Sequence, residues 1–94
     1  MKKIPFTIEI RNKLYDGHLI ANDFLQPPKN YLVFMENYVV GELMCRHDWT
    51  FTQGRWNKIL GKLNNNECNG IAEYLGNVAD SLYNLKSLSG KFKQ

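Results

Sequence analysis

The sequence contains little cysteine and no long apolar run. Only two cysteines, Cys45 and Cys68, are present among 94 residues, and the N-terminal stretch lacks the unbroken apolar segment of an export signal. We therefore expect free thiols rather than a disulfide. Because no apolar run approaches the roughly 18 residues that span a bilayer, we expect no membrane partner and a soluble, cytoplasmic protein.

The chain has only a small excess of positive charge. Twelve Lys and Arg residues are set against nine Asp and Glu residues, which gives a formal net charge of +3. This falls well short of the basic clustering that predicts nucleic-acid binding. A glycine-rich phosphate loop is also missing, since Gly70 and Gly76 lie inside an expected helix, where close packing against a partner backbone explains them better. We expect no nucleotide chemistry and no cofactor.

The overall composition is that of an ordinary globular protein. Hydrophobic residues make up 44% and charged residues 22% of the chain, which argues against wholesale disorder. A chain of this length suits one domain, which we place at residues 1–85. Residues 86–94, "KSLSGKFKQ", form a basic and poorly patterned tail that we expect to fray.

The first part of the chain shows the alternation of β-strands. Apolar and polar residues alternate from Ile4 to Ile10, which predicts a strand with one buried face. Pro5 lacks an N–H group, so the start of this strand belongs at a sheet edge. A polar turn leads into a less regular strand over residues 14–21, where Gly17 is a candidate for a bulge. The simplest product is a β-hairpin.

Three further strands are expected after the stretch "NDFLQPPKN", whose two prolines exclude regular structure. Residues 31–36 and 39–46 are rich in β-branched and aromatic residues and should pair antiparallel. The residues between them, Asn37-Tyr38, predict a tight turn with Tyr38 exposed. Residues 49–52 alternate aromatic residues with threonine, which predicts a fifth strand.

The last part of the chain shows helical spacing. Residues 56–63 place apolar residues three and four apart, which predicts a short helix or an ordered turn. From Cys68 to Leu82 the spacing continues for almost four turns, and Asn64 or Asn65 caps this helix, with Glu67 completing a capping box from Asn64. The expected architecture is α+β, an antiparallel β-meander of about five strands packed in two layers against one long C-terminal amphipathic helix.

The segments "VVGEL" and "DWTF", followed by "LNNNECNGIAEYLGNVADSLY", resemble small uncharacterised bacterial single-domain proteins. Those proteins consist of a strand meander closed by one C-terminal helix. The resemblance covers residues 4 to 84 and rests on pattern. It implies the fold and brings no activity with it.

The stretch "CRHDW" places a thiol near an imidazole, which is the pairing of cysteine nucleophiles. Cys45 shares a strand face with Val39 and Leu43, however, so we expect it in the core, where a thiol acts as a small hydrophobe. A catalytic pair of Cys45 and His47 is therefore disfavoured. A zinc site built from the two cysteines and two histidines lacks ligand pairs at the usual spacing. We expect neither catalytic nor metal-binding residues.

Aromatic residues exceed the space available in so small a core. Exposed tyrosine and tryptophan anchor protein interfaces, although the alternative is that the two tryptophans plug one end of the core. The leading hypothesis is a non-enzymatic binding or interaction module that self-associates or binds a protein partner not named by the sequence. Its expected interaction surface consists of Tyr31, Tyr38, Trp49, Trp56, Arg46 and Arg55.

Two other functions remain as alternatives. Basic residues are interleaved with aromatic residues, as in weak single-stranded nucleic-acid binders, but acidic residues interrupt them and the consensus of RNA-recognition motifs is absent. A small enzyme that uses Cys45 or His47 is the third hypothesis.

Overall fold

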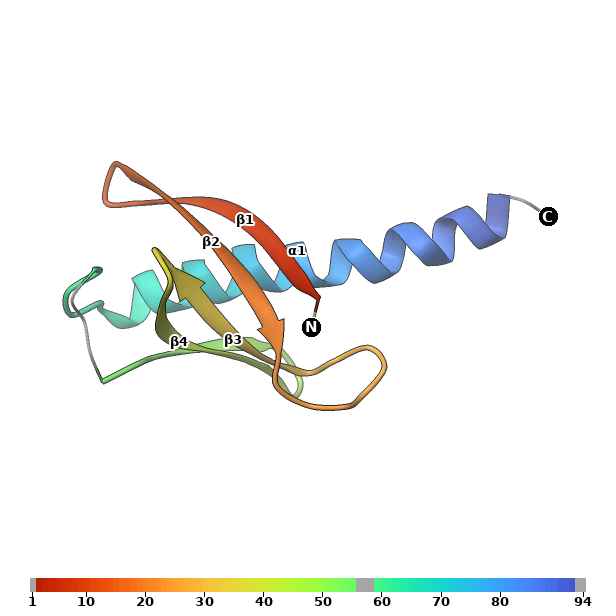
Figure 1. Ribbon diagram of the computed structural model, residues 1–94, viewed down its shortest axis with the longest axis horizontal. Coiled ribbons are helices and arrows are strands. Elements are labelled where there is room, and N and C mark those ends of the chain that lie inside the picture. Colours follow the sequence, from red (N-terminus) through yellow and green to blue (C-terminus); the bar gives the residue numbers. More distant parts are fainter. Residues whose placement is uncertain (1, 56–58, 93–94) are drawn as a thin grey trace.

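The computed structural model describes the backbone of residues 2–55 and 59–92, and the side chains of these residues as far as Leu82. It contains a five-stranded antiparallel sheet in the order β1-β2-β3-β4-β5, with one helix along one face (Figure 1). The α+β meander with a C-terminal helix is thus confirmed. The elements are β1 (Lys3–Ile10), β2 (Lys13–Ala21), β3 (Asn30–Met35), β4 (Tyr38–Cys45), β5 (Trp49–Gln53) and α1 (Asn65–Phe92).

Two hairpin turns carry the left-handed backbone that the sheet needs. Arg11 and Asn12 have φ of 54° and 64°, and Glu36 and Asn37 have φ of 51° and 68°. Two successive residues with positive φ form the turn whose twist matches paired antiparallel strands. The second turn lies one residue earlier than expected, because Tyr38 is the first residue of β4 and pairs with the last residue of β3.

The sheet contains one irregularity in register, and it is not at Gly17. The pairing of β1 with β2 is continuous. A Cβ atom at Gly17 would lie 2.1 Å from the Phe34 carbonyl oxygen and 2.6 Å from Cζ of Phe6, so glycine makes room for both. The register shifts between β3 and β4 instead, where Val40 is the extra residue. This bulge buries Val40 and leaves Val39 45% exposed, so the expected burial of Val39 was wrong.

The core lies between α1 and the inner face of the sheet, which is the face toward the helix. The sheet is curved, because α1 contacts both edge strands, β1 and β5, as well as β4. Tyr31 is only 1% exposed and belongs to this core. The edge position of Pro5 in β1 is confirmed. The core residues of the strands are Phe6, Ile8, Ile10, Tyr15, Leu19, Tyr31, Val33, Met35, Val40, Leu43 and Phe51, and those of the C-terminal half are Leu60, Leu63, Ile71, Ala72, Leu75 and Ala79.

The helix extends beyond the stretch with clear apolar spacing. It continues from Leu82 to Phe92 and projects past the sheet (Figure 1). The fraying of residues 86–94 stays a prediction. Within the described residues, no helix combines the length and the apolar character that crossing a bilayer requires. Of the expected element at 56–63, residues 56–58 lie outside the described residues, and Ile59 and Leu60 form a turn.

Candidate functional site

The structure assigns Tyr31 and Trp49 to the interior rather than to a binding surface. Tyr31 is buried, because its position in β3 faces the helix side of the sheet. The ring of Trp49 lies 6.1 Å from that of Tyr31 and packs against the core. Trp56 lies outside the described residues. The prediction that Tyr31 belongs to an interaction surface was therefore wrong, and the alternative that tryptophan plugs the core holds for Trp49.

Gly76 explains how the bulky Trp49 side chain is accommodated. A Cβ atom at Gly76 would lie 2.4 Å from Cγ and Cδ1 of Trp49, which is far inside the van der Waals separation of non-bonded carbon atoms. The indole N–H donates a hydrogen bond to Oδ2 of Asp80 at 3.1 Å, one turn further along α1. Gly76 is thus a packing glycine, as expected, although a side chain and not a backbone fills the gap.

The other three members of the expected surface are exposed but separated. Tyr38 begins β4 and is 59% exposed, whereas Arg46 follows the last residue of β4. The eight residues of β4 span roughly 26 Å at the rise of a strand. Arg55 lies at the same end as Tyr38, because the preceding Gly54 donates a hydrogen bond to the Val40 carbonyl. One continuous surface of the six predicted residues is not formed.

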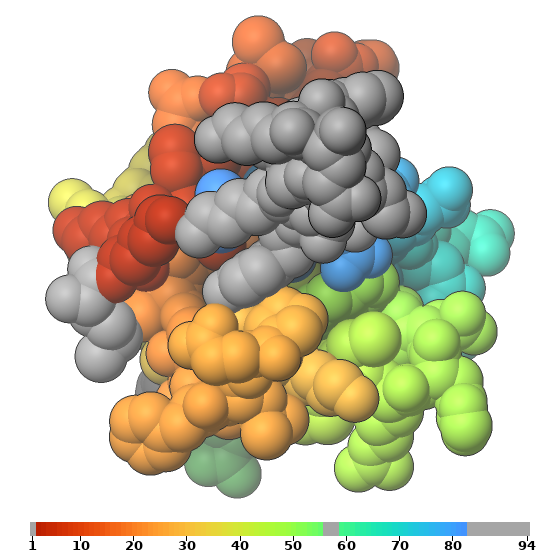
Figure 2. Space-filling view, turned by 90° about the vertical axis from the view of Figure 1, so that its right-hand side faces the viewer, coloured from red at the N-terminus to blue at the C-terminus, as the bar shows by residue number. Residues whose placement is uncertain are grey.

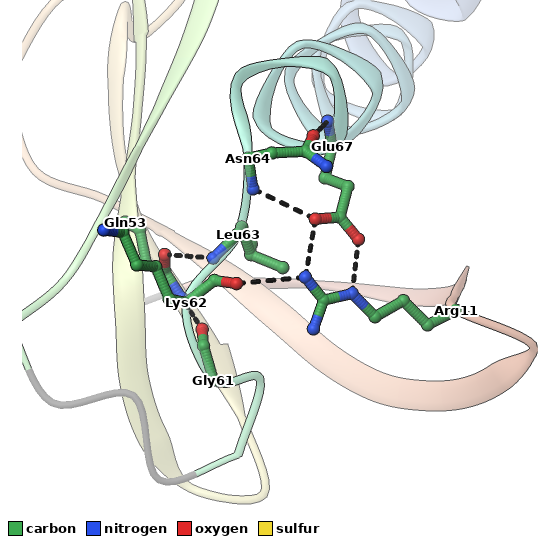
Figure 3. Close-up of polar contacts among 7 residues, drawn as sticks. All are labelled: Arg11, Gln53, Gly61, Lys62, Leu63, Asn64 and Glu67. Carbon is green, nitrogen blue, oxygen red and sulfur yellow. Dashed lines mark hydrogen bonds and ion pairs between the residues drawn. The ribbon is translucent and has the colours of Figure 1, made fainter.

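A charged contact joins the turn after β1 to the first turn of α1, at the end of the sheet where β4 begins and β5 ends (Figure 3). Nε and Nη2 of Arg11 donate to the two carboxylate oxygens of Glu67, at 2.5 and 2.7 Å, and Nη2 also donates to the Lys62 carbonyl at 3.0 Å. The Asn64 side chain accepts from the Glu67 N–H at 2.8 Å, and the Glu67 carboxylate accepts from the Asn64 N–H at 3.0 Å. This confirms the predicted capping box.

The charge on Glu67 is stabilised by these donors. Hydrogen bonds from Arg11, and then from the Asn64 backbone, lower the pKa of Glu67 to about 2, while the pKa of Arg11 is raised by the same pair. Nearby, Gln53 of β5 accepts a hydrogen bond from the Leu63 N–H at 3.0 Å and donates to the Gly61 carbonyl. Both contacts fix the start of α1 against the two edge strands, so their role is structural.

The outer face of the sheet, which faces away from α1, carries a second set of apolar side chains. His18 stacks on Phe34 with ring centroids 4.8 Å apart and an interplanar angle of 7°. Ile20 pairs directly with Leu32 on the neighbouring strand. In β2 and β3 these four residues alternate with buried ones, so they lie on the outer face. Two residues of β4 pair with residues of β3 on that face and lie there as well. We call this set the outer patch: His18, Ile20, Leu32, Phe34, Val39 and Met44.

A signal for the outer patch exists in the sequence. The stretch "YLVFM" is apolar at every position, whereas a strand with one face in water alternates. In β3 the odd positions of this run are buried and the even positions are half-buried on the outer face. A continuous apolar run in a sheet with helix on only one side therefore indicates that the second face is apolar too.

Carboxylates flank the outer patch. Asp16 lies on the same face of β2 as His18, and its Oδ1 accepts a hydrogen bond from Thr7 at 2.8 Å. Glu42 pairs with Leu32 across β3 and β4 and lies on the same face. In β1, Glu9 alternates with the buried Ile8 and Ile10, so its carboxylate lies on the outward-facing side as well. Lys3 pairs with Ile20 and lies on this face too, so the apolar centre is flanked by these three carboxylates and the Lys3 ammonium group.

The residues considered for catalysis or metal binding do not come together. Cys45 is half-buried at the end of β4 and His47 is exposed in the following loop, with no hydrogen bond between them. Cys68 packs against the core from α1, and His18 lies on the outer face. Burial raises the pKa of the Cys68 thiol, and Glu67 raises it further. Across the described ranges, no three His, Cys, Asp or Glu side chains form a metal-binding group.

Two hollows lie where α1 meets the edge strands. One is a groove of about 590 Å³ between β1 and α1, which we call the β1–α1 groove; its walls include Ile10, Leu14, Gly70 and Ile71. The Tyr74 hydroxyl donates to the Thr7 carbonyl at 2.5 Å at one end of this groove, and the Arg11 contact closes the other. The second hollow, of about 330 Å³, is lined by Asp48, Trp49, Asn69, Glu73 and Asn77.

Comparisons of this chain with protein-family models, with curated proteins and with solved structures found no match. The resemblance to small bacterial proteins stays an expectation from pattern.

Proposed function

We propose that the chain is a non-enzymatic protein-interaction domain whose outer patch binds an amphipathic segment with basic flanks. The observation that carries this proposal is the apolar outer face of β2, β3 and β4, in which His18 stacks on Phe34 and Ile20 pairs with Leu32. Contiguous exposed apolar patches with polar surroundings are typical of interaction sites. Val39 presents further apolar surface, at 45% exposure.

The dimensions of the outer patch favour a helix as the bound segment. Three neighbouring strands at a spacing of about 4.8 Å cover roughly 10 Å, which is close to the diameter of an α-helix with its side chains. A helix with an apolar stripe would lie along this strip, in the way that amphipathic helices dock on apolar surfaces.

The charges on the outer face favour a basic partner. Glu9, Asp16 and Glu42 outnumber Lys3 around the apolar centre, so Lys or Arg residues beside the stripe of the partner gain complementary contacts. Two copies of the same face would bring like charges together. The same carboxylates repel phosphate, which makes single-stranded nucleic acid the less favoured occupant of this face.

We further propose a cytoplasmic setting for this interaction. Cys45 and Cys68 are both free thiols in the structure, and free thiols are typical of a reducing compartment. The third hypothesis, an enzyme that uses Cys45 or His47, gains no support from the positions of these two side chains.

A pair of designed peptides tests the proposed function. One has a leucine stripe flanked by lysines, and the other has glutamates in place of the lysines; binding is followed by NMR shifts of the backbone amides. The lysine peptide should shift amides of β2, β3 and β4, and the glutamate peptide should not. Equal shifts with both peptides, or none with either, would contradict the proposal.

Charge reversal provides the matched variants. Glu42→Lys on the outer face should weaken binding of the lysine peptide by about tenfold, which is the size of a lost surface charge pair in a partly dehydrated contact. Glu73→Lys makes the same change of charge on the exposed side of α1 and should leave binding nearly unchanged. If both variants weaken binding equally, attraction is due to net charge and not to the outer patch.

A further inference from the structure

The loop between β2 and β3 holds two apolar side chains out in solvent. Phe24 is fully exposed and Leu25 is 53% exposed. The loop is nevertheless ordered by hydrogen bonds, because the Asp23 carboxylate accepts from the N–H groups of Leu25 and Lys29, both at 3.1 Å. The Lys29 carbonyl in turn accepts from the N–H of Cys45 at 2.8 Å. Figure 2 shows this loop, coloured orange, at the surface of one end of the molecule.

A loop fixed in this way is suited to insertion into a pocket. Exposing a phenylalanine has no stabilising effect on the domain itself. Because the backbone is already ordered by Asp23, little conformational entropy is lost when Phe24 and Leu25 bind. These two residues therefore have the properties of an interface anchor.

The β1–α1 groove has the complementary shape and chemistry. Its volume of about 590 Å³ and its walls of Ile10, Leu14 and Ile71 offer apolar space. Gly70 lies in this wall, and a Cβ atom there would meet nothing within 4 Å. A glycine inside a helix lowers its stability, and whereas Gly76 is explained by Trp49, no contact within the described chain explains Gly70.

The charges beside the two elements are opposite. Glu9 is exposed on the edge strand β1, where it borders both the outer face and the groove. Lys29 is exposed at the base of the loop. Arg11 and Glu67, at the end of the groove, neutralise each other. A loop that enters the groove thus brings a cation toward an unneutralised carboxylate.

We infer that the β1–α1 groove of one molecule receives Phe24 and Leu25 of a second copy. A molecule does not fill its own groove, because the loop follows Ala21 at one end of β2 while the groove extends from Thr7 to Arg11 toward the other end of β1. The contact joins two different surfaces, so two molecules related by a two-fold axis make it twice. The groove shares Glu9 with the border of the outer face but none of the six residues of the outer patch, and the inference does not rest on the proposed function.

The expected association is weak. A phenylalanine buries about 150–250 Å², and two such anchors with their surroundings fall below the roughly 800 Å² per partner of a stable interface. Sedimentation velocity from about 10 μM to about 1 mM should therefore show a monomer that becomes a dimer at the upper concentrations. A wild-type protein that stays monomeric throughout this range would overturn the inference.

Variants of each surface separate the two halves of the contact. Phe24→Ser removes the anchor and Gly70→Lys fills the groove, and each should shift the dimerisation midpoint at least tenfold upward in concentration. Tyr38→Ser removes an exposed aromatic elsewhere, and Asn69→Lys adds the same charge to α1 outside the groove; both controls should dimerise like the wild type. If Phe24→Ser and Gly70→Lys dimerise unchanged, the contact is not the one inferred.

A mixing experiment decides whether the two surfaces meet each other. In an equimolar mixture of Phe24→Ser and Gly70→Lys, the intact loop of the second variant fits the intact groove of the first, so association should return in part. Two variants that had damaged one shared surface would not complement, and a mixture that stays monomeric overturns the inference. If Gly70→Lys fails to fold by circular dichroism, Leu14→Lys in the opposite wall takes its place in the same mixture.

Discussion

The two glycines in α1 allow the packing of Trp49 to be measured against an internal reference. Gly70 and Gly76 lie in the same helix, and changing either to alanine removes the same backbone penalty of about 0.5–1 kcal/mol. They differ in what the new methyl group meets. At Gly70 it meets nothing within 4 Å, whereas at Gly76 it meets Cγ and Cδ1 of Trp49 at 2.4 Å and Cβ at 2.9 Å.

The expected changes in stability therefore have opposite signs. Gly70→Ala should raise the free energy of unfolding by about 0.5–1 kcal/mol. Gly76→Ala gains the same helix term but overpacks the Trp49 contact at a cost of about 1–3 kcal/mol. The difference between the two variants, about 1–3 kcal/mol, is the packing cost alone. In a domain of this size each kcal/mol of this difference should separate the Tm values of the two variants by roughly 4–8 °C.

Urea unfolding of both variants, at a protein concentration low enough to keep the chain monomeric, measures this difference. Trp49→Phe provides the control, because a smaller ring should relieve the contact and reduce the cost of Gly76→Ala in a double-mutant cycle. If Gly76→Ala stabilises the protein as much as Gly70→Ala does, the indole does not pack on Gly76 and the reasoning is refuted.

Three further predictions concern the ion pair, the tryptophan and a thiol. Because the pKa of Glu67 is lowered to about 2 from 4.5, its contribution to stability is present above about pH 4.5 and is lost as pH falls toward 2. In a carbon-13 NMR titration of the Glu67 carboxyl, Arg11→Met should return the pKa of Glu67 toward its usual range. A wild-type Glu67 whose pKa already lies in that range would show that the ion pair with Arg11 does not form. Trp49→Ala should lower the free energy of unfolding by about 3 kcal/mol, near the lower end for such a truncation because the ring is only partly buried. An unchanged Tm would show that Trp49 does not pack against the core. In the Cys45→Ser variant, Cys68 should alkylate more slowly in the folded state than in urea at the same pH, because burial raises its pKa, and equal rates would show that the thiol is not shielded.

Much of the architecture follows from local pattern. The alternation from Ile4 to Ile10, the edge position of Pro5 and the capping box of Asn64 and Glu67 were all predicted and are all present. Each depends on residues a few positions apart, whose geometry is determined by the pleat of a strand or the turn of a helix. Such features are specified before the chain is compact.

The candidate surfaces depended on contacts between distant residues. Side chains in a strand alternate with a period of two, so the one extra residue in β4, Val40, changes which side chains at the start of this strand face the core. Likewise Arg11 meets Glu67 across 56 positions, and Gly70 and Gly76 look equivalent in sequence until the sheet brings Trp49 to only one of them. Composition and periodicity determined which residues are apolar and in which element they lie. Only the curvature of the sheet around α1 decided which of them are covered, since burial is a property of the neighbours that folding supplies.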